Sequence, residues 1–155
     1  MPAAAPAVPF LDDLQTGNML PGLTYEVNQD LIDAYGMASL DLNPVHMDPA
    51  WCERARVFGM PVPVAHGMMS MSFMASAVYR AWGALAEITR VESKFTKPCP
   101  IGSIVTVRAM VRDLHPLGDG EDYATLTVEA TDQSDSVIGV SEIDVRLRRR
   151  PGAKP

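Results

Sequence analysis

The sequence has little of what would tie the chain to an oxidising compartment or to a membrane. Its 155 residues include two cysteines, Cys52 and Cys99, with neither CxxC spacing nor a framework of paired bridges. No stretch reaches the roughly 18 uninterrupted apolar residues of a membrane helix. The opening MPAAAPAVPF has neither the positively charged start nor the apolar core of a signal peptide. We therefore expect a cytoplasmic protein that does not associate with membranes.

Positive charge is also scarce over most of the chain. The formal net charge is −6, and residues 1–145 carry eight Lys and Arg against 19 Asp and Glu, a balance of −11. Because nucleic acids are polyanions, this acidic body predicts no nucleic-acid partner. The remaining cations lie in the last ten residues, which are interpreted as a solvated basic tail.

Several catalytic and cofactor motifs are absent. The chain has no GxSxG, no P-loop and no GxGxxG. Asp41, His46, Asp48 and His66 are residue types that bind metals, but their spacing matches no recognised zinc motif, so we expect no metal site.

The composition indicates one folded domain. With 47% hydrophobic and 21% charged residues, the chain resembles soluble globular proteins, and a domain of this length buries roughly 70% of its unfolded surface. The Ala- and Pro-rich residues 1–10 predict a flexible arm. The domain is expected over residues 11–149, and residues 150–155 are assigned to the basic tail.

The first half of the domain has helical signals. A short strand is expected near residues 23–28, followed by a helix with Asn28 as its N-cap. Residues 40–47 are expected to form a loop. Asp48 is expected to cap a short helix that ends near Gly59.

A long helix is predicted from about His66 to Trp82, after an irregular connection that contains two prolines. Its residues are apolar on all sides, which predicts a helix buried all round. Its methionines are expected to be core residues, some of which would line an acyl tunnel. Gly83 is well placed to end the helix.

Beyond residue 86 the hydrophobic period changes to two, which predicts antiparallel strands. The alternating runs lie near residues 105–111, 123–130 and 141–148, and His115 is expected in a solvent-facing turn between the first two. One buried helix followed by strands indicates an α+β fold in which a curved sheet wraps around the helix.

The segment DLNPVHMDP holds the first chemical candidates, Asp41 and His46. Pro44 biases Asn43 away from helical geometry, which keeps this segment an exposed turn. A carboxylate and an imidazole on such a turn can hold a water molecule between a base and an acid. The alternative is structural, with Asp41 capping the turn and His46 bonded to a backbone group.

The segment AHGM at the start of the long helix holds the second pair of candidates. The unpaired N–H groups of a helix N-terminus can stabilise a developing oxyanion, and Gly67 lets a ligand approach the backbone closely. In the alternative interpretation, which we favour for His66, the histidine satisfies a buried hydrogen bond and Gly67 permits tight packing.

Taken together, DLNPVHMDPAW, AHGMM and FTKPCPIGS resemble the MaoC-like dehydratase family, which includes (R)-specific enoyl-CoA hydratases and has the hot-dog fold. The resemblance covers about residues 12–148. It implies Asp41 and His46 as the catalytic pair, with the Gly67 N–H as donor to the thioester oxygen. It also implies that Asn43 orients the loop and that Ser72 lies near the site. Asn43, His66 and Ser72 are accordingly assigned as candidate substrate-binding residues.

Phe95, Pro98 and Gly102 match the family pattern at the start of a strand, whereas Cys99 and Ser103 stand where valine and aspartate are usual. This departure leaves the catalytic residues untouched but weakens any inference about the substrate subclass.

The resemblance implies reversible hydration of a trans-2-enoyl-CoA to an (R)-3-hydroxyacyl-CoA, without a metal or redox cofactor, in a homodimer or a dimer of dimers. A 3-hydroxyacyl-ACP dehydratase or a hydratase of branched acyl-CoA are alternatives. A hot-dog thioesterase and a non-catalytic subunit of a heterodimeric dehydratase match less well.

The phosphates of coenzyme A require cations, which are few in this chain. Arg90, Lys94 and Lys97 follow the long helix and are candidates to meet them, with Lys94 and Lys97 as the main substrate-binding candidates. In the alternative interpretation they lie on a solvated strand face.

Overall fold

The computed structural model of the chain describes residues 10–83 and 86–153, so most of the predicted N-terminal arm lies outside the described residues. The helices are η1 (Leu11–Asp13), α1 (Gln29–Ser39), α2 (Pro44–Met47), α3 (Pro49–Ala55), η2 (Val57–Gly59) and α4 (Gly67–Trp82). The strands are β1 (Leu23–Glu26), β2 (Glu87–Phe95), β3 (Ile104–His115), β4 (Tyr123–Thr131) and β5 (Val137–Arg146).

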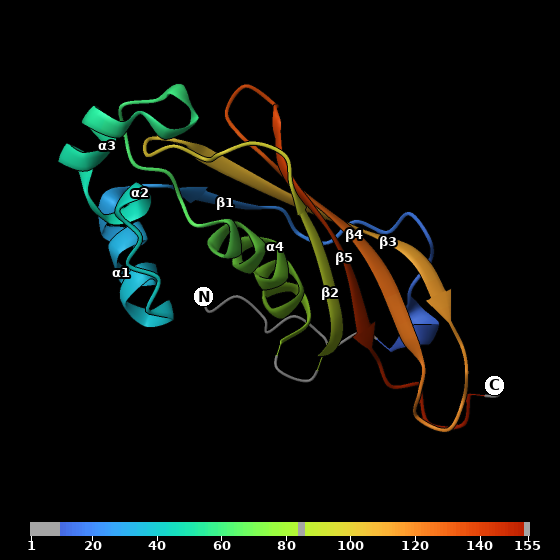
Figure 1. Cartoon of the computed structure of the whole chain (residues 1–155). Helices are drawn as coiled ribbons and strands as arrows, with labels where there is room; N and C mark the ends of the chain where they lie inside the picture. Colours follow the sequence, from blue (N-terminus) through green and yellow to red (C-terminus); the bar gives the residue numbers. More distant parts are fainter. Residues whose placement is uncertain (1–9, 84–85, 154–155) are drawn as a thin grey trace, which may run out of the picture.

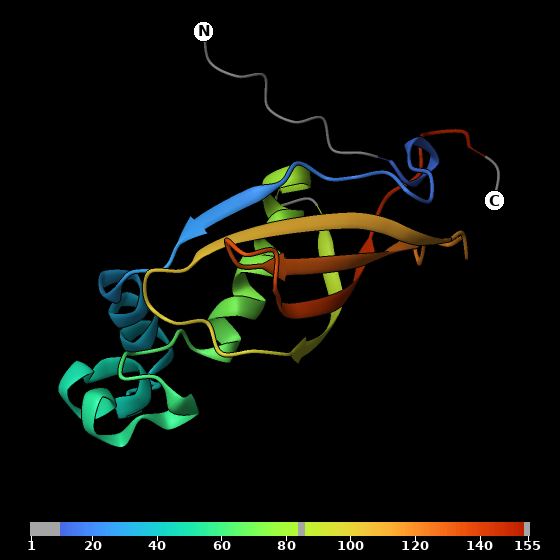
Figure 2. The same cartoon turned by 90° about the horizontal axis from the view of Figure 1, so that it is seen from above.

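The strands form one antiparallel sheet in the order β1-β3-β4-β5-β2. The sheet curves along α4, while α1, α2 and α3 gather at one end of the molecule (Figure 1). Figure 2 shows the described residues that follow β5 at the opposite end. The predicted α+β architecture, a curved antiparallel sheet around a central helix, is confirmed.

The strands bury the residues that the period of two predicted. Val105, Val107 and Val111 of β3 are fully buried, as are Leu126 and Val128 of β4. Ile143 and Val145 of β5 continue the same inner face. Because alternate side chains of a strand point to opposite faces, these residues form a single core layer against α4.

The prediction that α4 is buried on all sides is wrong in this single chain. Met69, Phe73 and Met74 face the core, whereas Met68 and Tyr79 are each 52% exposed. A sheet covers a helix from one side, and within residues 10–83 and 86–153 no strand covers the opposite side of α4 (Figure 1). The predicted end of the helix is confirmed, since Gly83 is its C-cap with φ of 72°.

The two predicted caps in the first half of the domain are confirmed. The Asn28 Oδ1 accepts a hydrogen bond from the Leu31 N–H at 2.9 Å, at the start of α1. The Asp48 Oδ1 accepts one from the Trp51 N–H at 2.9 Å, at the start of α3. Each side chain satisfies an N–H group that the first helical turn leaves without a partner.

Two boundaries differ from the prediction. The expected loop at 40–47 contains the one-turn helix α2, because Pro44 occupies its first position and Asn43, the residue kept extended, serves as the N-cap. Helix α3 ends at Ala55 rather than near Gly59. It stops because Arg56 adopts left-handed geometry, with φ of 46°, and a separate 3-10 turn follows.

His115 does not face solvent in a turn, as predicted, but ends β3 and is half-buried. Its ring stacks on Tyr123 with 4.2 Å between centroids, and its Nε2 lies 3.1 Å from the Thr125 Oγ1. Both partners lie on β4, which pairs with β3 in register. The pairing of the strands therefore fixes the position of this histidine.

The basic C-terminus is not simply a solvated tail. Arg149 Nε lies 3.1 Å from the Asp122 Oδ2, and the Arg150 guanidinium is 2.7 Å from the Asp13 Oδ1. Asp122 lies in the turn between β3 and β4, whereas Asp13 belongs to η1, which lies beside the residues after β5, where the Leu11 N–H donates to the Arg148 carbonyl at 2.9 Å. The acidic residues of η1 thus meet the cations that end the domain.

Both cysteines are buried and unpaired. Among the helices of residues 10–83 and 86–153, none has the length and hydropathy needed to cross a membrane.

Leu126 provides a test of the core. It is fully buried, so Leu126→Ala should lower the free energy of unfolding by about 2–5 kcal/mol through lost burial and the cavity left behind. Leu117, which is 66% exposed, is the matched control, and Leu117→Ala should change the value by less than about 0.5 kcal/mol. Urea denaturation measures both. Equal losses in the two variants would contradict the assignment of the core.

Candidate active site

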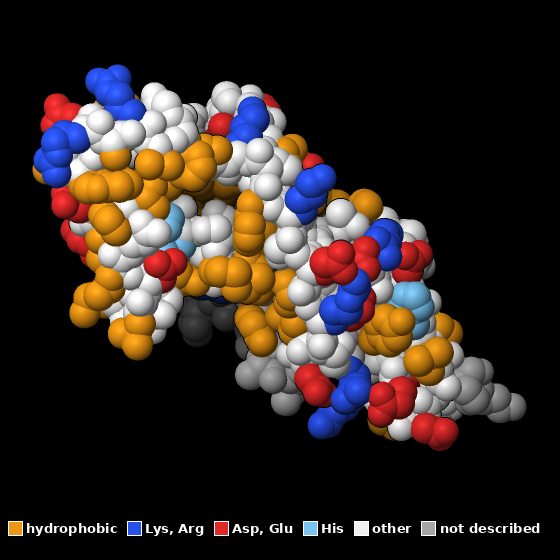
Figure 3. Space-filling model, viewed as in Figure 1, with side chains coloured by type: hydrophobic (Ala, Val, Ile, Leu, Met, Phe, Trp, Pro, Cys, Tyr) orange, Lys and Arg blue, Asp and Glu red, His pale blue; other side chains and the backbone are white. Residues whose placement is uncertain are grey.

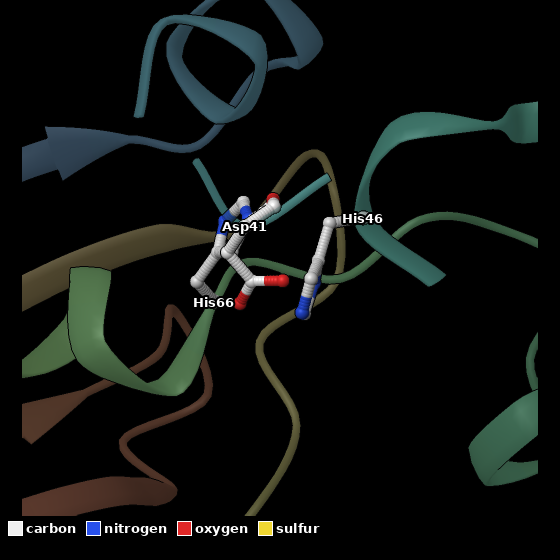
Figure 4. Close-up of side chains that lie close together, drawn as sticks. All are labelled: Asp41, His46 and His66. Carbon is white, nitrogen blue, oxygen red and sulfur yellow. Dashed lines mark hydrogen bonds between the residues drawn. The ribbon is translucent and has the colours of Figure 1, made fainter. Parts of the chain in front are cut away.

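The three candidate side chains meet where α1, α2 and α3 approach the start of α4. Asp41 follows α1, His46 lies on α2, and His66 is the N-cap of α4. Each offers a ligand-type atom, and these atoms all lie within 4.8 Å of one another. Figure 4 shows the Asp41 carboxylate close to the rings of both histidines. The fold therefore brings together residues that are up to 25 positions apart in the sequence.

Hydrogen bonds hold His46 from two sides. Its Nδ1 lies 2.7 Å from the Val64 carbonyl oxygen, and because a carbonyl only accepts, Nδ1 carries the proton. Its own carbonyl accepts a hydrogen bond from the Gln29 Nε2 at 3.0 Å. Asn43 caps α2 by accepting from the Val45 N–H at 3.2 Å. These contacts leave the Nε2 lone pair of His46 as the proton acceptor.

The surroundings of His46 favour its neutral form. Desolvation by burial lowers its pKa, and the nearby His66 acts in the same direction. The hydrogen bond to Val64 and the charge of Asp41 oppose this shift without reversing it. An imidazole with a lowered pKa is unprotonated at neutral pH and can accept a proton.

Asp41 is exposed, and its backbone is fixed more firmly than its carboxylate. The backbone carbonyl of Asp41 accepts a hydrogen bond from the His66 Nε2 at 2.9 Å. Gly36 allows this close packing, since a Cβ there would lie 3.3 Å from the Asp41 carbonyl oxygen and 2.5 Å from the Met47 Sδ. The carboxylate accepts only a long hydrogen bond, from the Asn43 N–H at 3.4 Å, among the described residues. It therefore keeps acceptor capacity for a ligand.

A cavity of about 380 Å³ opens beside this cluster. Its polar lining includes His46, Gly67, Ser70, Thr96 and Lys97. The rest of the lining is mostly apolar. In Figure 3 orange side chains border the hollow beside the pale-blue histidine on the left. The cavity thus combines a few polar groups with a mostly apolar lining, a composition suited to small organic ligands.

The start of α4 forms part of the cavity wall. Gly67 is its first residue, and the N-cap residue His66 makes no side-chain capping hydrogen bond. A Cβ at Gly67 would lie 3.2 Å from two ring atoms of Phe95, so glycine also permits tight packing there. Gly67 thus brings the uncapped first turn of α4, whose N–H groups have no intrahelical partner, to the cavity wall.

Four of the predicted substrate-binding residues do not line this cavity. Asn43 instead caps α2 through the Val45 N–H, and His66 hydrogen-bonds the Asp41 carbonyl. The exposed Ser72 donates to the Met68 carbonyl at 2.9 Å. Lys94 lines a separate groove beside Arg112 and Glu142. Of the eight predicted site residues, the cavity itself contains His46, Gly67 and Lys97.

The three candidate cations are likewise separated. Arg90 pairs with Glu142 at 2.8 Å and lies 3.6 Å from the Asp144 carboxylate. Lys94 and Arg90 belong to β2, whereas Lys97 follows the strand and reaches the cavity. Lys97 is therefore the candidate for a ligand phosphate.

Ser70 and Gln29 belong to the site, although no sequence pattern singled them out. Ser70 is buried and lines the cavity, and its position three residues after Gly67 on a helix is the signal that would have found it. Gln29 carried no such signal, because its bond to the His46 carbonyl joins separate helices. Of the four possible metal ligands, Asp48 lies outside the cluster and is used to cap α3.

Comparison with known proteins agrees with this geometry. Residues 16–134 match the MaoC like domain. The chain belongs to the MaoC-like dehydratase family. The prediction of the family is thereby confirmed.

Solved structures share the fold of this MaoC-like chain. The R-hydratase PhaJ1 from Pseudomonas aeruginosa superimposes with a TM-score of 0.80 at 20% identity, covering 91% of this chain and 86% of that one. The (R)-hydratase from A. caviae involved in PHA biosynthesis gives 0.76 at 26% identity, covering 86% and 97%. The MaoC-like dehydratase from Rhodospirillum rubrum superimposes with a TM-score of 0.76 at 23% identity, covering 92% of this chain and 98% of that one. The hot-dog fold is thus confirmed.

A curated relative matches over a shorter range. The peroxisomal hydratase-dehydrogenase-epimerase of Neurospora crassa is 42% identical over 48 residues, which are 31% of this chain and 5% of that protein. The match therefore spans only a small part of that much longer relative.

The lowered pKa of His46 predicts a pH dependence of stability. An unfolded chain, with a histidine pKa of about 6.5, binds a proton before the folded chain does as the pH falls. The free energy of unfolding should therefore decrease below about pH 6.5, until the pH passes the lower folded pKa. His46→Gln should reduce this decrease, as measured by urea denaturation across the range. Above about pH 7.5 neither state binds this proton, which provides the control. Equal slopes in both proteins would contradict the prediction.

Proposed function

We propose that this MaoC-like chain is a hydro-lyase that reversibly adds water to a trans-2-enoyl thioester and forms an (R)-3-hydroxyacyl thioester. The observation that carries the proposal is the meeting of Asp41 and His46 beside a cavity that includes the first turn of α4. The family and the names of the structural neighbours support the same reaction class.

In the proposed hydration, a water molecule lies between the Asp41 carboxylate and the His46 Nε2. His46 takes a proton from the water as the water oxygen bonds to C3 of the substrate. The electron pair of the C2–C3 double bond moves toward the thioester oxygen, where the Gly67 N–H stabilises the enolate. Asp41 holds the water by hydrogen bonding while this attack takes place, and His46 afterwards returns the proton to C2 as the thioester carbonyl re-forms. No atom remains on the enzyme after the cycle.

The proposal includes coenzyme A as the carrier of the acyl group. Lys97 is the Lys or Arg residue that lines the cavity, in a domain whose body is otherwise acidic. It is therefore the candidate contact for the phosphates of coenzyme A. The apolar lining, which includes Val45, Phe58 and Ile138, would surround the acyl chain. Acyl carrier protein remains the alternative carrier.

Substitution of the acid/base pair tests the reaction. Asp41→Asn and His46→Gln should each lower kcat for crotonyl-CoA hydration by about 10²–10⁴-fold, because a positioned acid/base group contributes that much. The double variant should lose less than the product of the two, since both residues act on one water. Loss of absorbance from the conjugated enoyl thioester measures the rate.

His115→Gln, outside the site, is the control and should retain activity. Near-native turnover by either site variant would contradict the assignment. Release of free thiol in place of hydration would identify a thioesterase instead.

A matched pair of lysines tests the carrier. Lys97→Ala should raise KM for crotonyl-CoA with little change in kcat, because a phosphate contact acts equally in the ground and transition states. Lys94→Ala removes the same charge from a different groove and should leave KM unchanged. The effect of Lys97→Ala should disappear with crotonyl-pantetheine, which lacks the nucleotide phosphates, and should shrink at high salt. An unchanged KM in Lys97→Ala would place the phosphates elsewhere.

We also propose that the chain forms a homodimer or a dimer of dimers. Met68 and Tyr79 lie half-exposed on the uncovered side of α4, where a second copy would bury them. Light scattering should give at least twice the chain mass. A fully active monomer would refute this proposal.

A further inference from the structure

We propose that His66 is a positioning residue that sets the placement of Asp41 relative to His46. This inference rests on the proposed function, in which those two residues share one water. His66 is 1% exposed and does not line the cavity, so it acts on the reaction through its neighbours.

The first contact joins His66 to the Asp41 backbone. Its Nε2–H donates to the Asp41 carbonyl oxygen at 2.9 Å. Asp41 follows Leu40, whose φ of 60° is a strained conformation for a branched residue. A hydrogen bond directly after such a residue stabilises that conformation and fixes where the Asp41 side chain begins.

The second contact joins His66 to the His46 ring. The two rings stack with 3.9 Å between centroids and 28° between planes. The Val64 carbonyl fixes one edge of the His46 ring, and the stacked face of His66 limits rotation of the ring about that hydrogen bond. Tyr35 of α1 in turn packs on His66, with 4.9 Å between ring centroids. The His66 ring is therefore held in place while it holds both catalytic residues.

The remaining ring nitrogen of His66 adds no third contact to the hydrogen bond with Asp41 and the stacking on His46. Nδ1 is buried and has no hydrogen-bond partner among residues 10–83 and 86–153. A phenylalanine at this position therefore removes the bond to Asp41 while it keeps a flat ring against His46. A glutamine, whose amide nitrogen lies at a similar distance from the backbone, keeps a donor for Asp41 and removes the stacking. The two substitutions separate the contacts.

The experiment measures hydration of crotonyl-CoA by the unaltered chain, His66→Phe and His66→Gln. His66→Phe should lower kcat by about 10²-fold, the loss expected for a misplacement of about 1 Å in a reacting group. Its KM should stay within about twofold, because His66 does not line the cavity and uniform binding is unaffected. His66→Gln should recover at least about tenfold of the lost kcat, since it restores the hydrogen bond to Asp41.

His115→Phe is the matched control. His115 also stacks on an aromatic ring and hydrogen-bonds through Nε2, but it lies on β3 outside the site. It should retain kcat. An NMR titration of the His46 imidazole, which requires no turnover, should show an altered chemical shift in His66→Phe and the native shift in His115→Phe.

Three outcomes would overturn the inference while leaving the proposed function intact: native kcat in His66→Phe, equal loss in the Phe and Gln variants, or a loss carried by KM alone. Inactivity of the unaltered chain would instead overturn the proposed function. In that case the NMR measurement still tests the positioning role, and an unchanged chemical shift of the His46 imidazole in His66→Phe would overturn it. Thermal unfolding of each variant separates loss of fold from loss of placement.

Discussion

The packing of α4 against one face of the antiparallel sheet holds the rest of the structure in place. Met69, Phe73 and Met74 of the helix contact a layer of branched and small side chains from β3, β4 and β5. Burial of apolar surface on this scale fixes the axis of α4. Because Gly67 is the first residue of that helix, the same packing determines where its uncapped N–H groups point.

The segment that carries Asp41 and His46 is attached differently. Few of its side chains are buried, and polar contacts to the backbone hold it instead. Gln29 bonds the His46 carbonyl, the Val64 N–H donates to the Val45 carbonyl at 3.2 Å, and His66 bonds the Asp41 carbonyl. Hydrogen bonds are directional, so they orient a short segment that has too little apolar surface to orient itself.

Ion pairs of the domain lie on the outer face of the sheet and at the end of the chain that follows β5. On the outer face of the sheet, Arg90 and Arg112 both pair with Glu142 and lower the pKa of its carboxyl. The arginines that end the domain pair with carboxylates of η1 and the β3–β4 turn. These pairs engage four of the 13 Lys and Arg residues with carboxylates, whereas Lys97 lines the cavity.

The sequence alone determined the fold class, the caps Asn28 and Asp48, the inner faces of the strands and the candidates Asp41, His46 and Gly67. These features depend on local chemistry and on periodicity, which neighbouring residues carry. It did not determine which side of α4 stays uncovered, that Lys94 and Lys97 lie apart, or that His66 contacts both Asp41 and His46. Only the tertiary structure decided these features, because each depends on a contact between elements that are distant in the chain. The residue pattern within either element alone does not reveal such a contact.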